Sequence, residues 1–333
     1  MKDWFKNCLG SYRFWIFVVA CAYFLYALYF AIYGLRAGIE LILDPYAYNL
    51  VSRNPWWWAI LYYGSEGYLA AVACFLRVIA GCFAVYSAFL FWRKKDLALP
   101  QIRGKVSKAL LFEACHFFTL CLSVIAAFAY FFSTENLYYF DGTPELIYLS
   151  VGGLPVLALI LIVSPVLLKL RATIIRGVER QEIIRWSCLT GIAYLFVVFW
   201  FNFSMSWAGT LVPYGRSQQN YGINFLLEPA NLVSFAVTVF GLFLIAAFGL
   251  VSTLPVIRKK STKINSRRIG AVILALGGYF LFHMFYYYLL GGFEAHPSVW
   301  YEVIGPLHNP YFWCLSLFFL GVAVLLRGNN PQT

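Results

Sequence analysis

Charged side chains are scarce in this sequence of 333 residues. Aspartate, glutamate, lysine and arginine make up 12% of it, hydrophobic residues make up 62%, and the mean hydropathy is +0.73. Soluble domains carry about 25% charged residues, so this composition requires lipid as the main solvent. We therefore expect an all-α, polytopic integral membrane protein.

Signatures of catalysis and metal binding are also absent. The sequence holds no nucleophile elbow, phosphate-binding glycine loop, paired aspartate motif or His-Glu-x-x-His motif. Its eight cysteines form no Cys-x-x-Cys pair, so neither a disulfide framework nor a metal site is expected. All loops are short, which predicts a single transmembrane domain over residues 1–333. No cofactor is expected, and no motif favours an enzyme.

Eight apolar stretches are long enough to cross a bilayer as helices, which takes roughly 20 residues. They cover residues 14–35, 68–92, 109–132, 146–168, 183–210, 230–257, 269–290 and 307–326. With this assignment, 21 lysines and arginines fall on one side of the membrane and three on the other. Basic residues collect on the cytoplasmic side, so both termini are expected in the cytoplasm of a plasma-membrane protein.

The same distribution of charge limits the expected partners. The formal net charge of +11 reflects basic loops beside anionic lipid headgroups and does not indicate nucleic-acid binding. The lipid bilayer is the expected partner. Aromatic residues, at 20% of the chain, also offer surface for other membrane subunits.

A weak internal repeat is visible in two basic loops. Arg93, Lys94, Lys95 and Arg103 recur with the same spacing as Arg258, Lys259, Lys260 and Arg268, an offset of about half the chain. This pattern predicts two parallel four-helix halves, residues 1–168 and 169–333. The alternative is that cytoplasmic loops resemble one another without duplication.

Arg77 is the only lysine or arginine deep inside an expected span, since Arg185 lies at the cytoplasmic end of the span 183–210. A charge at that depth costs at least ~2.5 kcal/mol and usually faces a partner, a cavity or a substrate. Small residues, among them Ala73 and Ala80, recur on its side of the helix, whereas Val72 and Phe75 lie on the other. Because small residues mark close helix contacts, we expect Arg77 to point into the bundle. A structural ion pair is the alternative to a binding role.

Residue counting places His283 and Asn202 near the depth of Arg77, roughly 20 to 25 Å from the inner boundary. Tyr279 and Tyr286 share a face with His283. These five residues form our candidate substrate site, reached from the outer surface. The alternative for His283 and Asn202 is local hydrogen bonding between helices.

Glu113 and His116 lie three residues apart, hence on one helix face, at roughly 10 to 15 Å from the inner boundary. A carboxylate and an imidazole can exchange protons near neutrality, which makes them proton-relay candidates. Alternatively, Glu113 reaches the headgroups near Lys105 and Lys108. A di-iron site is disfavoured because Glu113 is the only acid in a span, and a haem held by His116 and His283 is disfavoured by their difference in depth.

Two outer-side histidines and two prolines have residue types found at functional sites but no specific pattern. His296 in an outer loop and His308 at the outer end of the span 307–326 have metal-ligand character but no diagnostic spacing, so solvated side chains are the preferred interpretation. Pro165 and Pro255 fall inside or near expected spans, where helices either break around a substrate or kink.

The functional hypothesis is a small-solute transporter or permease-like protein, in which Arg77 coordinates an anionic or polar solute. Three alternatives stay open. They are a quinone- or haem-binding subunit of a redox complex, a membrane enzyme acting on lipid-linked substrates, and a structural subunit of a membrane complex. No family resemblance is visible in the residues.

Overall fold

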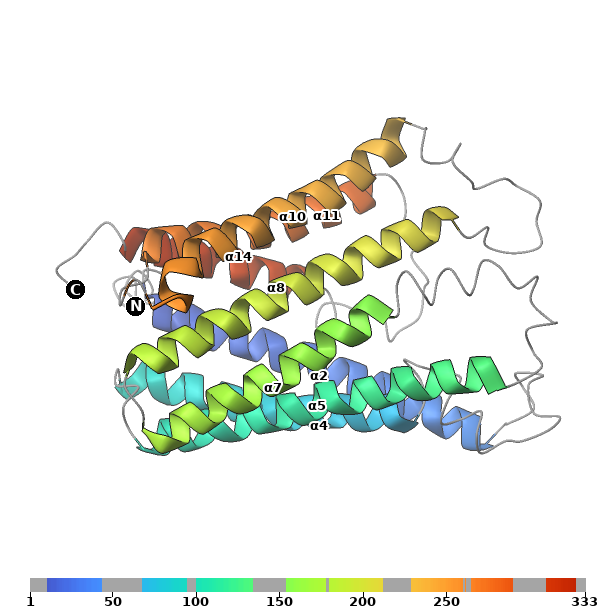
Figure 1. The fold of residues 1–333 in the computed structure, drawn as a ribbon, viewed down its shortest axis with the longest axis horizontal. Helices are drawn as coiled ribbons and strands as arrows, with labels where there is room; N and C mark the ends of the chain where they lie inside the picture. Colours follow the sequence, from blue (N-terminus) through green and yellow to red (C-terminus); the bar gives the residue numbers. More distant parts are fainter. Residues whose placement is uncertain are drawn as a thin grey trace, which may run out of the picture.

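A computed structural model describes residues 11–43, 68–94, 100–133, 154–177, 180–211, 229–259, 261, 265–289 and 310–327. These residues form eight α-helices and no strand, which confirms the all-α class over the described part of the chain. The helices are α2 (Tyr12–Leu43), α4 (Tyr68–Lys94), α5 (Pro100–Ser133), α7 (Leu154–Arg176), α8 (Arg180–Leu211), α10 (Pro229–Ile257), α11 (Ser266–Leu289) and α14 (Pro310–Arg327) (Figure 1).

Four of these helices contain stretches long and apolar enough to cross a membrane. Those stretches are Tyr12–Tyr29, Val72–Lys94, Arg180–Trp200 and Phe240–Ile257. Large apolar side chains such as Phe240 and Leu244 on α10 are more than 60% exposed, as expected where lipid rather than water covers the helix. The chain is therefore a helical membrane protein.

The helix ends follow local backbone chemistry. Proline begins α5, α10 and α14, where its missing N–H would have no partner in the helix anyway. The side chain of Asn265 caps α11 by accepting from Arg268 N at 3.2 Å. Gly177, with φ of 62°, follows the end of α7. Neither Pro165 nor Pro255 ends its helix, since α7 and α10 continue past them.

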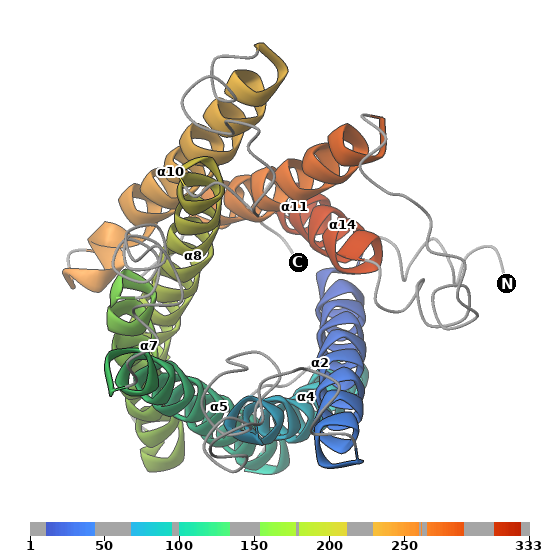
Figure 2. The ribbon, with the colours of Figure 1, turned by 90° about the vertical axis from the view of Figure 1, so that its right-hand side faces the viewer.

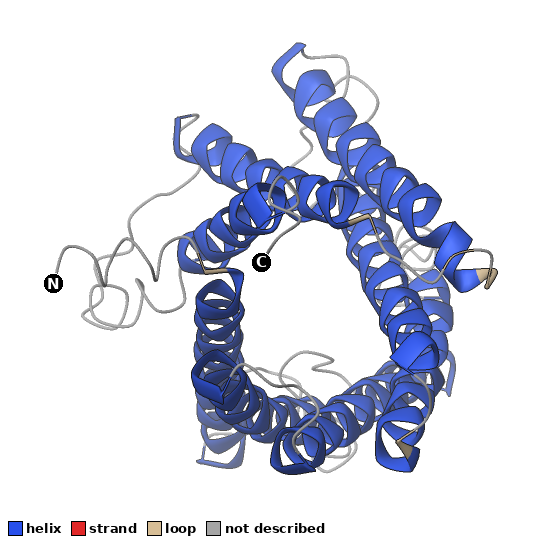
Figure 3. Ribbon diagram, turned by 90° about the vertical axis from the view of Figure 1, so that its left-hand side faces the viewer, coloured by secondary structure: helices blue, strands red, loops and turns tan. Residues whose placement is uncertain are grey.

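The helices are arranged as a ring in chain order (Figures 2 and 3). Each helix packs against the next one in the sequence, and α14 closes the ring against α2. At this closure the rings of Trp15 and Phe319 stack with centroids 4.9 Å apart. Apart from this closure, the contact surfaces of the ring are therefore formed between helices that follow one another in the sequence. We call each such surface a seam.

The tightest seam joins α11 and α14 through glycines. A Cβ added at Gly277 would lie 2.6 Å from Phe318 N, and one added at Gly321 would lie 2.5 Å from Leu274 N. Both contacts are with backbone, which cannot rotate away. Glycine at these positions lets the two helix backbones approach closely, as in other membrane helix pairs.

We predict that Gly277→Ala lowers the free energy of unfolding in detergent by about 2 kcal/mol, because the new methyl group forces the two backbones apart. The matched control is Gly278→Ala, where an added Cβ has no neighbour within 4 Å. Denaturant titration of both purified variants measures the difference. Equal stability of the two variants would show that the glycine seam is not tightly packed.

Candidate functional site

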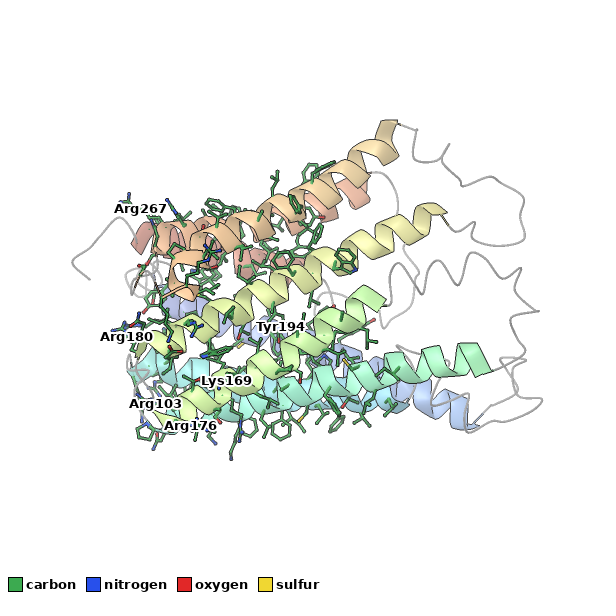
Figure 4. The ribbon with its side chains drawn as sticks, in the orientation of Figure 1. Arg103, Lys169, Arg176, Arg180, Tyr194 and Arg267 are labelled. Carbon is green, nitrogen blue, oxygen red and sulfur yellow. The ribbon has the colours of Figure 1, made fainter. Side chains whose placement is uncertain are left out.

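Four helices contribute side chains to one polar cluster in the bundle. Tyr23 comes from α2, Arg77 from α4, Glu113 from α5 and Tyr194 from α8. Tyr194 lies near the middle of the bundle's length, whereas Arg103, Arg176, Arg180 and Arg267 lie at one end (Figure 4). The cluster is therefore separated along the helices from that basic end.

Glu113 is the centre of the cluster. Its Oε1 lies 3.6 Å from Arg77 Nη2 and accepts a hydrogen bond from the Tyr194 hydroxyl at 2.9 Å. Its Oε2 accepts a hydrogen bond from the Tyr23 hydroxyl. The side chain is only 9% exposed. A buried carboxylate is stable only with such partners, and here both oxygens have one.

Arg77 is held less tightly than Glu113. Its Nε donates to the Tyr23 hydroxyl at 3.3 Å, and its guanidinium carbon lies 5.5 Å from the centre of the Tyr23 ring. The 3.6 Å ion pair is longer than a hydrogen bond, and 26% of the side chain is exposed. A guanidinium carries five N–H donors, so Arg77 retains donors for a further anion.

Arg77 lies on the face of α4 that packs against other helices. Ala73 and Ala80, one turn to either side, are 0% and 2% exposed, while Val72 and Phe75 on the opposite face are 51% and 59% exposed. The small-residue stripe thus lies where the sequence predicts it. Its small side chains let α5 approach closely enough for Glu113 to reach Arg77.

His116 lies one turn beyond Glu113 on the same face of α5. Its Nδ1 lies 2.7 Å from Ala73 O, and because a carbonyl oxygen only accepts, Nδ1 must carry the hydrogen. In the neutral imidazole, Nε2 is then an acceptor. His116 is 2% exposed, and its Nε2 is buried without a hydrogen-bond partner.

The structure corrects the sequence-based separation of Arg77 from Glu113. Counting from the expected span boundary placed Glu113 much nearer the cytoplasm. However, α5 begins at Pro100, nine residues before the expected span, so Glu113 lies about 20 Å along it, against about 26 Å for Arg77 from the end of α4. The long side chain of Arg77 spans that difference in depth. The alternative in which Glu113 reaches the headgroups is wrong.

The other predicted site residues are not brought to this cluster by any described contact. Tyr279 is buried on α11, where its ring packs against Gly241 of α10. The side chains of Asn202, His283 and Tyr286 lie outside the described part of the structure. Their membership of the site stays a prediction.

Two tyrosines of the cluster were missing from the predicted site. Tyr194 shares an expected span with Asn202 but was not predicted as a site residue, and Tyr23 is one of 24 tyrosines in a chain rich in aromatic residues. Tyr23 and Tyr194 lie 11 and 14 residues into α2 and α8, which brings them to the depth of Glu113, but these helix starts come from the structure and not from the sequence. No sequence signal marks them as partners of Glu113.

Metal binding finds no support among the described residues. They contain no group of three histidine, cysteine or acidic side chains that could hold an ion. His296 and His308 lie outside the described residues. The seven cysteines that the structure describes are free thiols.

Comparisons with protein-family models, with curated proteins and with solved structures returned no match.

We predict that Glu113→Gln lowers the free energy of unfolding by about 3 kcal/mol, because Arg77 keeps its charge in a buried site without a counter-charge. The double variant Arg77→Met/Glu113→Gln should recover most of that loss, since it removes both charges and keeps an acceptor oxygen for one tyrosine. Denaturant titration in detergent measures both. A double variant no more stable than the single one would show that the unpaired charge is not the cause.

Tyr194→Phe should cost about 2 kcal/mol, because it removes one hydroxyl donor from a buried carboxylate. Tyr86→Phe is the matched control. Its ring is 48% exposed and contacts Lys105 Nζ through the π face at 5.1 Å, so losing the hydroxyl should change stability by less than about 0.5 kcal/mol. Thermal unfolding of the two variants side by side distinguishes them. Similar losses in both would contradict the role of the Tyr194 hydroxyl.

Proposed function

We propose that this protein transports a small anionic solute across the membrane together with a proton. The observation that carries the proposal is the Arg77–Glu113 pair, a fixed positive charge whose only described counter-charge is a carboxylate on another helix. An anionic solute can take the place of that carboxylate at the guanidinium. Arginine is well suited to this, because its planar donors match carboxylate and phosphate oxygens.

Charge balance couples the solute to a proton. In a low-dielectric site Arg77 is stable beside one negative charge, and a second one would repel the first. With no solute bound, Glu113 supplies that charge. When Glu113 takes a proton, Arg77 is left for the anion. One anion and one proton therefore bind together, and the site is neutral in both states.

The hydrogen bonds of the cluster connect this exchange to helix movement. Glu113 of α5 is bonded to Tyr23 of α2 and to Tyr194 of α8, and α5 and α8 are separated in the ring by α7. Protonation of Glu113 weakens both bonds, because a neutral carboxyl is a weaker acceptor than a carboxylate. Release of Tyr194 would free α8 to move relative to α5, which is the kind of rearrangement that alternating access requires.

We also propose that all eight helices cross the membrane as a single domain, with both termini in the cytoplasm of a plasma-membrane protein. The basic side chains at one end of the bundle support this orientation (Figure 4). Duplication of a four-helix half stays a prediction. No contact among the described residues favours a redox subunit, a lipid-modifying enzyme or a structural subunit.

Reconstituted liposomes loaded with a pH-sensitive dye test the proposal. Inward gradients of chloride, sulfate, phosphate or lactate are imposed one at a time, and the signal of protein-free liposomes is subtracted. We expect at least one of these anions to acidify the lumen, because each anion enters with a proton.

Arg77→Met/Glu113→Gln is the control, since it should fold but lacks both charges. It should give no acidification. Anion entry without acidification would contradict proton coupling. Equal transport by the double variant, or no transport of any of the four anions by the unmodified protein, would contradict the proposed function itself.

A further inference from the structure

His116 Nε2 is a buried acceptor with no partner. Leaving such a group unpaired is costly relative to a hydrogen-bonded one, so native proteins contain few of them. The tautomer is fixed by the bond from Nδ1–H to Ala73 O, which holds the ring between α4 and α5. Nε2 is thus kept in the accepting form by the fold itself.

The carboxylate one turn away needs such an acceptor when it is protonated. In the charged state both oxygens of Glu113 accept hydrogens, from Tyr23 and from Tyr194. A proton added to Glu113 turns one of these acceptors into a donor. Tyr23 offers no simple replacement, because its oxygen already accepts from Arg77 Nε. Tyr194 could accept only by turning its own hydroxyl hydrogen away from Glu113. The protonated carboxyl therefore has no acceptor among its present partners unless one of these hydroxyls reorients.

Helix geometry places the two groups within reach. Residues three apart on a helix have Cβ atoms about 5 to 6 Å apart, and a glutamate side chain is long enough to turn toward its neighbour. His116 is also tied to the helix that carries Arg77, since its Nδ1 bonds to the carbonyl oxygen of Ala73, one turn before Arg77. Tyr194 also packs close by, since its ring and that of Phe117, the residue after His116, lie 5.4 Å apart.

We propose that protonated Glu113 turns away from Arg77 and donates its hydrogen to His116 Nε2, so that His116 stabilises the anion-loaded state of the site. This inference rests on the proposed function and assigns His116 as a positioning residue for the coupled proton. The proton arrives from water and stays on Glu113. No covalent bond other than the new O–H forms or breaks, and the guanidinium is left for the anion.

The groups around the pair are compatible with this exchange. Tyr23 faces it from α2, Arg77 from α4 and Tyr194 from α8. From α7, the hydroxyl of Ser164 donates to Ala114 O at 2.9 Å, and no titratable side chain of that helix has a described contact with the pair. A proton on His116 would add a further charge to the buried site, whereas a proton on Glu113 removes one, so the proton is assigned to Glu113.

Infrared difference spectroscopy of the full-length protein in detergent tests the assignment. The sample is acidified in sodium chloride, whose anion has no infrared absorption and serves as the probe for Arg77. We expect a carbonyl band of a protonated carboxyl that is absent in Glu113→Gln. In His116→Asn this band should move to higher frequency, and the proton concentration for its half-maximal appearance should rise about tenfold, the effect of losing one hydrogen bond.

Two matched variants separate this role from a structural one. Asparagine at position 116 can keep the donor to Ala73 O but removes the Nε2 acceptor, whereas His116→Gln can place an amide oxygen near the Nε2 position and should restore the band. A spectrum of His116→Asn equal to that of the unmodified protein would overturn the inference and leave anion transport standing. Absence of any protonated carboxyl in the unmodified protein would contradict proton coupling on Glu113, and the inference with it.

Discussion

The ion pair between Arg77 and Glu113 constrains everything around it. Neither charge is stable alone in an apolar bundle, so α4 and α5 must pack in the register that joins them. That register in turn requires small side chains at Ala73 and Ala80. Tyr23 and Tyr194 then supply the remaining hydrogen bonds of the carboxylate, which ties α2 and α8 to the same point. One buried carboxylate thereby fixes the relative positions of four helices.

The same ion pair allows Arg77 to have both a structural role and a binding role. In many proteins a buried salt bridge contributes no more to stability than apolar residues of similar size would. Here the guanidinium is more exposed than the carboxylate, and the ion pair is longer than a hydrogen bond. Glu113 is therefore the firmly held partner and Arg77 the adaptable one. A site that exchanges its counter-charge needs this asymmetry.

Hydropathy alone predicts the helices well, because runs of apolar residues identify the part of a helix that lies in lipid. It does not identify where the helix begins, and α5 starts nine residues earlier, among basic residues that hydropathy excludes. That offset separated Glu113 from Arg77 in the sequence-based prediction. Arg77 itself was found because a lone charge in an apolar span is rare. Tyr23 could not be found, since a tyrosine in a membrane helix is common and its partner depends on packing.

The order of the helices around the ring has a consequence for how the protein is made. Each helix packs mainly against the one synthesised before it, so every new helix finds its packing partner already in the bilayer. Few contacts between helices distant in sequence have to form later. Only the closure between α14 and α2 joins the last described helix to the first described one. Biogenesis can therefore proceed as stepwise addition, and the cluster around Glu113 is complete once α8 has been inserted, before α10, α11 and α14 are added.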